Sequence, residues 1–367
     1  MRVAILCPYS LSRPGGVQGQ VLGLARALRT LGHDATVLAP ADGPLVDTGL
    51  PPGAVVVLGR SLALPANGSV APVALGPGAS WRAVRALRRG DFDVLHLHEP
   101  LAPGPSYACL VAAPQPRVGT FHRAGGSAFY RALGPLARWA ANRLAVRCAV
   151  SAEAEATASE ALGGEYLVVG NGVELDRYAD APPWPTEGPT ILFIGRHEDR
   201  KGLAVLLQAF EDLPPDHPAT LWIAGDGPER DVLERRHPAG PTRQWLGRIP
   251  DDELASRLRG ADILCAPSLR GESFGVILLE AMAAGAALVA SDLPGYAAVA
   301  GDHALLVPPG DTAALTAALA DLIADASAGT GRCSSEALEA ALDHAGRWSM
   351  TALAERYVEI YAQVVAG

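Results

Sequence analysis

Short apolar runs alternate along this chain with longer segments in which apolar residues recur every three or four positions. In the first half, the runs span residues 2–8, 33–40, 93–98, 117–121, 148–151 and 166–170. After the first run, residues 18–31 have the periodicity of an amphipathic helix, which ends at Gly32. Strands that alternate with helices are typical of βα units and of a parallel sheet.

The same alternation starts again in the second half, with apolar runs at residues 190–195, 219–225, 262–268, 286–292 and 304–309. The polar, proline-rich stretch 180–190 has the composition of a linker. We therefore expect an α/β protein with two Rossmann-like domains, residues 1–175 and 187–347, facing a cleft of the kind in which such sheets bind ligands. The final segment, 348–367, predicts an amphipathic helix that can pack on either half, including back on the N-terminal domain.

The composition fits a two-domain enzyme. The chain has 367 residues, enough for two hydrophobic cores, and 49% of them are apolar. No apolar run approaches the roughly 18 residues that cross a bilayer, and the first segment is too short for a signal peptide. The five cysteines are scattered, without the spacing of metal ligands, which favours a reducing cytoplasm over a disulfide framework.

Charge is distributed unevenly. The net charge is −9; residues 1–173 contribute +5 (15 Arg against 10 Asp and Glu) and residues 174–367 contribute −14 (15 Lys and Arg against 29 Asp and Glu). The acidic total argues against general nucleic-acid binding. The basic first half suits an anionic acceptor or the anionic inner face of a membrane, although unevenly spread solubility charge would give the same pattern.

Two glycine-containing segments stand where phosphate groups bind in such folds. Gly15 and Gly16 lie between the first strand and the first helix, so the backbone can approach an anion there, although glycine pairs also make plain turns. The segment 195–202 (GRHEDRKG) brings three cations and two glycines to a strand end; a solvated charged loop is the alternative. Of the 30 Lys and Arg residues only Lys201 is a lysine, which indicates a need for a compact ammonium unless chance left one.

A third segment, 271–280 (GESFGVILLE), holds two carboxylates eight positions apart. Glu272 lies on a loop, and Glu280 lies about one turn into the helix that follows. One carboxylate can accept hydrogen bonds from a sugar and the other from a ribose, while the helix N-terminus faces phosphate. The alternative is an acidic residue at a helix start together with a buried capping glutamate.

These segments resemble the retaining glycosyltransferases of family four, which have the GT-B fold. The segment 271–285 is similar to the family's E-x7-E signature, and Arg196 with the RKG sequence at 200–202 is similar to its diphosphate-binding pair. The resemblance covers essentially the whole chain. Within the family, CPYSLSRPGGVQ, LPANGSVA, DFDVLHLHEP and GTFH are most similar to the lipid mannosyltransferases, which move mannose from GDP-mannose to the inositol of a membrane lipid.

The resemblance implies a role for each matching residue. It assigns the catalytic roles to His122, Glu272, Arg196 and Lys201, although a structural histidine at a strand end is the alternative for His122. The implied donor site comprises Gly15, Gly16, Arg196, Lys201, Glu272, Ser273, Phe274, Gly275, Val276 and Glu280. The implied acceptor site comprises Tyr9, Gln18, Asn67 and Arg123. The nucleotide sugar is a co-substrate, and the implied mechanism needs neither a metal nor another cofactor.

The acceptor side departs from the lipid mannosyltransferases. Those enzymes carry cations just after the NGSVA segment, whereas residues 67–74 here contain none. A membrane surface is nevertheless indicated by a short segment with Trp81 and the arginines Arg82, Arg85, Arg88 and Arg89. Packing of Trp81 against its own domain is the alternative.

We therefore expect a retaining glycosyltransferase that transfers mannose from GDP-mannose to a phosphatidylinositol-type lipid. A second interpretation keeps the donor site and uses a GDP- or UDP-sugar on a soluble natural-product or cyclitol acceptor. A third is a protein that binds a nucleotide sugar without turnover. A dehydrogenase is disfavoured because no GxGxxG follows the first strand. The sequence leaves the oligomeric state open.

Overall fold

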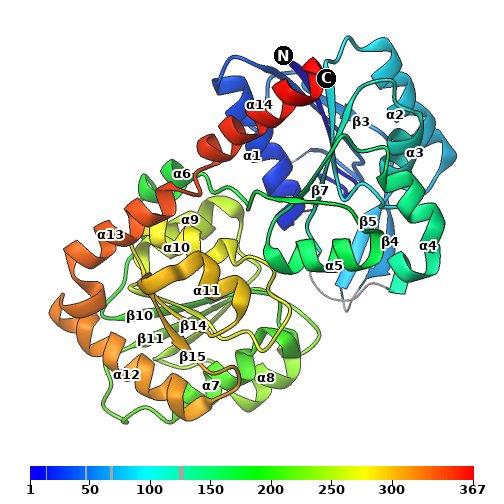
Figure 1. Ribbon diagram of the computed structural model, residues 1–367. Helices are drawn as coiled ribbons and strands as arrows, with labels where there is room; N and C mark the ends of the chain where they lie inside the picture. The colour runs from blue at the N-terminus through cyan, green and yellow to red at the C-terminus, as the bar shows by residue number, and fades with distance from the viewer. Residues whose placement is uncertain (14, 46–47, 67–68, 124–127) are drawn as a thin grey trace. The chain divides into compact units, whose positions relative to one another are not determined.

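The computed structural model describes residues 1–13, 15–45, 48–66, 69–123 and 128–367. The chain forms two compact units (Figure 1). Unit 1 comprises Met1–Gly172 and Met350–Gly367, and unit 2 comprises Val173–Ser349.

Unit 1 is built on a seven-stranded parallel sheet with the strand order β3-β2-β1-β6-β7-β8-β9. The strands are β1 (Arg2–Leu6), β2 (Asp34–Ala39), β3 (Val55–Val57), β6 (Val94–His98), β7 (Arg117–Phe121), β8 (Val146–Ala149) and β9 (Leu167–Val168). A separate antiparallel hairpin joins β4 (Leu62–Ala66) to β5 (Ser69–Val73). The helices are α1 (Gly16–Thr30), α2 (Pro77–Arg89), α3 (Pro105–Ala112), α4 (Ala128–Ala141), α5 (Ala152–Leu162) and α14 (Met350–Ala366).

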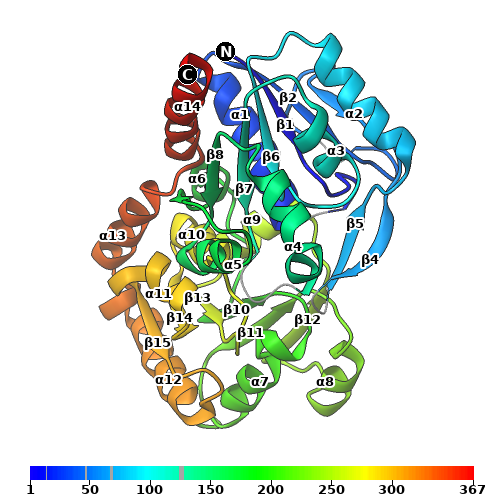
Figure 2. The ribbon, with the colours of Figure 1, turned by 45° about the vertical axis from the view of Figure 1, so that its right-hand side comes forward.

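Helices cover both faces of this sheet because successive residues of a strand point to opposite sides. Val3 and Ile5 of β1 pack in one core with α1 and α14, whereas Ala4 and Leu6 pack in the other with α2, α3 and α4. The helices α2, α3 and α4 lie together on one side of the sheet in Figure 2. Burial on both faces explains why residues 3–6 of this strand are all apolar.

Unit 2 is a second, six-stranded parallel sheet with the order β12-β11-β10-β13-β14-β15. The strands are β10 (Thr190–Ile194), β11 (Thr220–Ala224), β12 (Arg243–Gly247), β13 (Ile263–Ala266), β14 (Ala287–Ser291) and β15 (Ala304–Val307). The α-helices are α6 (Leu175–Ala179), α7 (Leu203–Glu211), α8 (Arg230–Arg236), α9 (Asp251–Gly260), α10 (Val276–Ala284), α11 (Pro294–Ala300), α12 (Thr312–Ala328) and α13 (Ser335–Gly346). Three 3-10 turns are η1 (Asp199–Lys201), η2 (Gly301–His303) and η3 (Gly331–Cys333).

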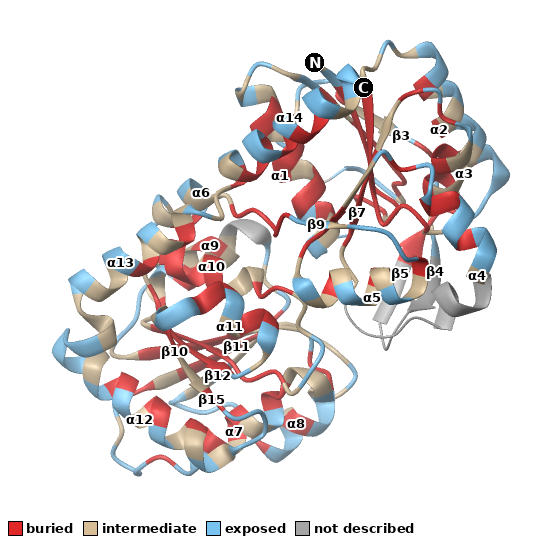
Figure 3. Cartoon of the chain, in the orientation of Figure 1, coloured by how far each residue is buried: buried red, intermediate tan, exposed pale blue. Residues whose placement is uncertain are grey.

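The sheet of unit 2 is also covered on both faces. Leu192 of β10 packs in a core with α9, α10, α11 and α13, whereas Ile191 and Phe193 pack in another with α7, α8 and α12. Figure 3 shows the central strands of each sheet buried and the outer faces of the helices exposed. Two doubly covered parallel sheets confirm the predicted α/β class.

The strands expected from apolar runs are all present, and the structure adds β3, β4, β5 and β12. Of these additional strands, β3 and β12 lie at sheet edges, and β4 and β5 form the separate hairpin. Edge strands bury less surface, so their sequences carry a weaker apolar signal.

The proline-rich stretch 180–190 is not a linker between the units. Its Trp184 donates a backbone hydrogen bond to the Ser256 carbonyl (2.9 Å), and the Arg257 guanidinium lies 3.7 Å from the centre of the indole ring. These contacts attach the stretch to α9. The chain instead passes from one unit to the other at residues 172–173 and 349–350. The terminal helix α14, for which the sequence left two options, packs against α1 in unit 1.

Candidate functional site

In unit 2, the loop that the sequence predicts to bind a diphosphate follows β10. It runs through Arg196 to the 3-10 turn η1, which contains Lys201, and α7 begins directly after Gly202. Gly202 has φ +68°, and a Cβ atom there would lie 1.9 Å from the carbonyl oxygen of Pro267. Only glycine fits this position, because both the backbone conformation and the close approach exclude a side chain. The close approach brings the loop after β10 against the loop after β13.

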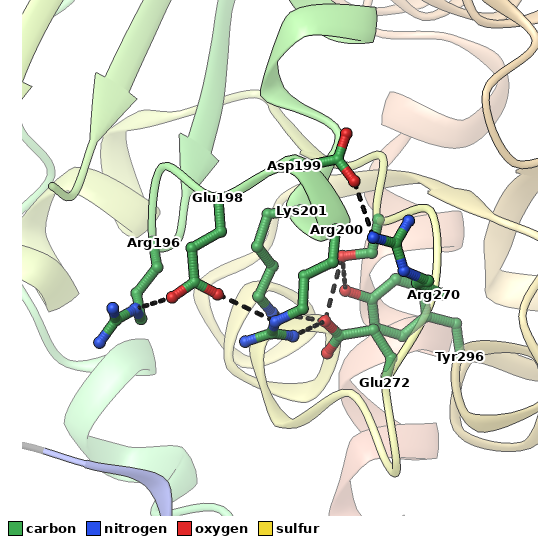
Figure 4. Close-up of polar contacts among 9 residues, drawn as sticks. Arg196, Glu198, Asp199, Arg200, Lys201, Arg270, Glu272 and Tyr296 are labelled. Carbon is green, nitrogen blue, oxygen red and sulfur yellow. Dashed lines mark hydrogen bonds and ion pairs between the residues drawn. The ribbon is translucent and has the colours of Figure 1, made fainter. Parts of the chain in front are cut away.

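Charged side chains from these two loops form one connected network (Figure 4). Lys201 Nζ donates to Glu272 Oε1 at 2.5 Å, and Arg200 Nη1 lies 3.4 Å from the same oxygen. Arg200 Nε also donates to Glu198 Oε2 at 3.0 Å, and Arg196 Nε donates to the other oxygen of Glu198. Three cations thus share two carboxylates, which leaves a net charge of +1 and further N–H donors.

Exposure differs between the members of this network. The side chains of Glu198 and Glu272 are 9% and 12% exposed, whereas those of Lys201 and Arg196 are 21% and 47% exposed. The cations therefore reach solvent while the carboxylates lie behind them. Such an arrangement can present charge-assisted donors to a diphosphate at the carboxyl edge of a parallel sheet.

Glu272 has two further polar neighbours that the sequence did not identify. Ser268 Oγ donates to Glu272 Oε1 at 3.1 Å and lies 3.1 Å from the hydroxyl of Tyr296. Burial raises the pKa of Tyr296, and the nearby charge of Glu272 raises it further. Tyr296 comes from α11, twenty-four positions beyond Glu272, so no local pattern connects them.

The segment 271–280, which carries Glu272 and Glu280, enters α10 through two glycines. Gly271 and Gly275 have φ +78° and +91°, and a Cβ on Gly275 would lie 2.6 Å from Tyr296 Cδ1. Gly275 is the N-cap residue of α10 and has no side chain with which to cap it, so the positive end of the helix remains available to an anion. Glu280 is half-buried in the second turn of this helix.

Three predicted donor residues of this loop lie near the helix start in different environments. Ser273 and Val276 are half-buried. Phe274 is 5% exposed, and its ring packs edge-on against Trp348 with 5.2 Å between ring centres. The side chain of Phe274 belongs to the hydrophobic core, so its predicted contribution to the donor site falls to its backbone.

In unit 1, the predicted Gly15–Gly16 pair begins α1. Gly15 is the N-cap residue, in an extended conformation, and a Cβ on Gly16 would have open space around it. Gln18 follows in the first turn and is buried; its Nε2 donates to the carbonyl oxygens of Ser10 (3.3 Å) and Arg13 (3.2 Å). The amide nitrogen of Gln18 thus attaches the loop before α1, and its predicted role in the acceptor site stays a prediction.

The other predicted residues of unit 1 lie after its central strands. His122 follows β7, is half-buried, and its Nε2 lies 2.8 Å from Nδ1 of His98 at the end of β6. Burial lowers the pKa of His122 to about 4, so the ring is neutral at pH 7. Tyr9 follows β1, and burial raises its pKa, with the charge of Glu99 as the next cause.

Two acceptor residues remain. Arg123 follows His122, and its buried Nε has no hydrogen-bond partner among the residues that the structure describes. Asn67 lies outside the described residues.

The arginine-rich segment forms α2. Trp81 is 59% exposed, and the Arg85 guanidinium lies 4.7 Å from the centre of a Trp81 ring. Arg88 and Arg89 are exposed in the last turn, and Arg82 Nε donates to the Leu58 carbonyl at 2.6 Å. Trp81 therefore does not pack into its own domain.

No helix in the described part of the chain is long and apolar enough to cross a membrane. The exposed face of α2 carries Trp81, Arg85 and Arg88, whereas Leu87 is fully buried. The helix turns Leu87 toward the sheet, where it packs with Ala79 and Ala83.

Comparison with known proteins places both units in one family. Residues 14–177 match the family described as "Glycosyltransferase Family 4", and residues 188–325 match "Glycosyl transferases group 1". A phosphatidyl-myo-inositol mannosyltransferase of Mycolicibacterium smegmatis is 42% identical over 337 residues, which cover 89% of this chain and 85% of the relative. The protein of that name from Mycobacterium leprae is 41% identical, over 88% of this chain and 87% of the relative. A glycogen synthase of Mycobacterium tuberculosis is 30% identical, over 77% and 70%.

Solved structures share the fold. The Anabaena protein Alr3699/HepE, crystallised in complex with UDP, has a TM-score of 0.74 at 20% identity, covering 99% of this chain and 100% of that one. WaaG, a glycosyltransferase involved in lipopolysaccharide biosynthesis, has a TM-score of 0.68 at 17% identity, covering 98% and 99%. With two parallel-sheet units, the connected Arg196–Lys201–Glu272 network and these relatives, the chain belongs to glycosyltransferase family 4 and has the GT-B fold.

Proposed function

We propose that this glycosyltransferase transfers mannose from GDP-mannose to a phosphatidylinositol-type lipid with retention of the anomeric configuration. The observation that carries the proposal is the identity of 41–42% over about nine-tenths of the chain to proteins named phosphatidyl-myo-inositol mannosyltransferase. The network around Glu272 supports it, because its more exposed cations and less exposed carboxylates suit a diphosphate and a sugar.

In this proposal each member of the network of unit 2 has a chemical task. Arg196 and Lys201 neutralise charge on the leaving diphosphate, the positive end of α10 adds to this, and Glu272 accepts hydrogen bonds from hydroxyls of the sugar. Glu280 accepts from the ribose. Stabilisation of the departing charge is the main electrostatic contribution, since the network is in place before the reaction.

The reaction breaks the bond between the anomeric carbon of the sugar and the β-phosphate oxygen. The sugar passes through an oxocarbenium-like state, the acceptor hydroxyl oxygen attacks from the face that the diphosphate leaves, and a phosphate oxygen takes the hydroxyl proton. We assign His122 to the reacting sugar and Tyr9, Arg123 and Asn67 to the acceptor. A neutral His122 suits this role, because its ring can hydrogen-bond a hydroxyl without adding positive charge.

The acceptor is the part of the proposal with a specific rival. Residues 67–74 contain no cation, so fewer partners are available for a lipid phosphate. This observation favours a soluble cyclitol or natural product as the second candidate. A protein that binds the nucleotide sugar without turnover is the third candidate. The presence of Arg196, Lys201 and Glu272 together argues against it, because the family resemblance assigns catalytic roles to all three.

Binding of nucleotides tests the donor first. Calorimetry with GDP, UDP, GDP-mannose and UDP-glucose should show selective, submillimolar binding of GDP and GDP-mannose. Preference for UDP would remove the mannosyl-lipid assignment and leave the diphosphate site intact. Binding without transfer to any acceptor or to water would favour the third candidate.

Vesicles test the acceptor and the membrane surface together. We propose that the exposed face of α2 meets anionic lipid, because Trp81 suits the interface and Arg85 and Arg88 suit the headgroups. The protein should sediment with phosphatidylinositol vesicles and transfer mannose to them. Trp81→Ser with Arg88→Ala should sediment less. Val232→Ser is the matched control because Val232 on α8 is equally exposed, at 59%; an equal loss in both variants would contradict a specific surface on α2.

A further inference from the structure

Glu99 is in a backbone conformation that its residue type disfavours. Within the described part of the chain it is the one residue other than glycine with a positive φ, +49°. L-residues with a Cβ atom rarely adopt this region. Pro100 follows, and a residue before proline prefers extended backbone.

The surroundings hold Glu99 in this conformation on both sides. Its backbone N–H donates to the Thr120 carbonyl on β7 at 2.8 Å, and its carbonyl accepts from the N–H of Ala102 at 2.9 Å. The side chain also has a defined task, since Glu99 Oε1 accepts the backbone N–H of His122 at 2.8 Å. Glu99 is 8% exposed. Neighbouring structure therefore maintains a strained residue whose carboxylate attaches the segment that carries His122.

The position of Glu99 in the sheet makes this attachment relevant to function. The sheet order changes direction at β1 and β6, because β2 lies on one side of β1 and β6 on the other. Ligands of open α/β sheets bind outside the carboxyl ends of strands at such a point. Tyr9 follows β1, Glu99 follows β6 and His122 follows β7, so all three stand at this edge.

We propose that Glu99 is a positioning residue for His122: its carboxylate holds the backbone of His122, and thereby its imidazole, where the ring meets the sugar. Strain that a fold retains at such a place is a sign of function, because selection for stability alone would replace the residue. The inference rests on the proposed function for the role of His122. It does not depend on which nucleotide or acceptor the enzyme uses.

Four variants of the full chain separate the strain from the hydrogen bond. Glu99→Gly removes both, Glu99→Ala removes the hydrogen bond and keeps the strain, and Glu99→Gln keeps an acceptor oxygen for the His122 N–H. His122→Ala removes the ring and completes a double-mutant cycle with Glu99→Gly. The thermal unfolding temperature measures the effect of the backbone strain on stability. The kcat and KM values for sugar transfer report whether His122 is correctly positioned.

We expect Glu99→Gly to unfold about 2–4 °C above Glu99→Ala, because glycine accepts a positive φ. Both should lower kcat about 10- to 100-fold, since a small displacement of a reacting group has this effect, and Glu99→Gln should lower it less. In the His122→Ala background, Glu99→Gly should change kcat by less than twofold. If the kcat loss of the double variant equals the product of the losses of the two single variants, Glu99 acts independently of His122 and the proposal is overturned. An unchanged kcat in Glu99→Gly would also overturn it.

A merely structural role gives a different pattern. It predicts that kcat per folded molecule is unchanged in Glu99→Gly, Glu99→Ala and Glu99→Gln, so that activity falls only with the fraction of folded protein. The order of the unfolding temperatures reports the backbone strain in either case. Failure of the proposed function is separately visible, because the unchanged protein would then transfer no mannose. In that case the unfolding temperatures still test the strain, and the cycle is measured in whichever sugar transfer the unchanged protein performs.

Discussion

Removal of the Lys201 ammonium should weaken diphosphate binding about tenfold or more. A charge-assisted hydrogen bond contributes about 1.5–3 kcal/mol, which corresponds to about a 10- to 150-fold change in dissociation constant. Lys201 is paired with Glu272 at 2.5 Å without ligand. An ammonium has three N–H donors, so it can keep this carboxylate and still bind a phosphate oxygen. We therefore expect the lower part of the range for Lys201→Ala.

The same substitution should leave the fold intact. Glu272 keeps Ser268 at 3.1 Å and Arg200 at 3.4 Å when Lys201 is removed. Its charge is thus not left without a partner, so we expect a loss of about 1–2 kcal/mol rather than the 3–5 kcal/mol of a broken buried pair. Urea unfolding followed by circular dichroism measures this difference.

Calorimetry with GDP and with guanosine is the decisive assay, because guanosine has the base and ribose without the diphosphate. Lys201→Ala should weaken binding of GDP and leave guanosine unchanged. Arg236→Ala on α8 is the matched control, because it removes one exposed positive charge from another element of the same unit. Equal weakening of GDP and guanosine, or GDP affinity equal to that of the control, would refute a direct contact between Lys201 and the diphosphate.

Three further outcomes follow from the geometry. Gly202→Ala should lower the unfolding free energy by at least about 2 kcal/mol and weaken GDP binding, because φ is +68° and backbone atoms occupy the space of a Cβ. Gly240→Ala is the control and should do neither, because a Cβ there would have open space around it. Urea unfolding and calorimetry with GDP compare the two variants. Leu87→Ala should lower the unfolding free energy by about 2–5 kcal/mol and Leu136→Ala by less than about 0.5 kcal/mol in the same assay, because Leu87 is fully buried and Leu136 is 63% exposed. Equal losses would contradict the burial of Leu87 between α2 and the sheet. Burial lowers the pKa of His96 to about 3, so the unfolded chain binds one more proton between pH 6.5 and 3, and stability present above pH 6.5 is lost as the pH falls. His96→Gln should reduce the pH dependence of the unfolding free energy by about 1.4 kcal/mol per pH unit in that range, and an unchanged slope would contradict this.

The local pattern of the chain determined the α/β class, the central strands of both sheets and the phosphate-oriented loops. Period-2 and period-3.6 spacing directly reflect which faces are buried, so central strands such as β1 and β10 are visible in the sequence. The loops around Arg196, Lys201 and Glu272 were identified because glycines and charges at strand ends have a local physical reason. The family signature rests on the same loops.

Only the tertiary structure decided which distant residues meet. It joined Tyr296 and Ser268 to Glu272, buried Phe274 and the amide of Gln18, and attached the 180–190 stretch to α9. It also placed α14 on α1 and Glu99 against the backbone of His122. Apolar periodicity indicates that one face of an element is buried, but it does not identify the element against which that face packs. Contacts across a sheet edge depend on strand order and loop path, which the chain acquires only when its units pack.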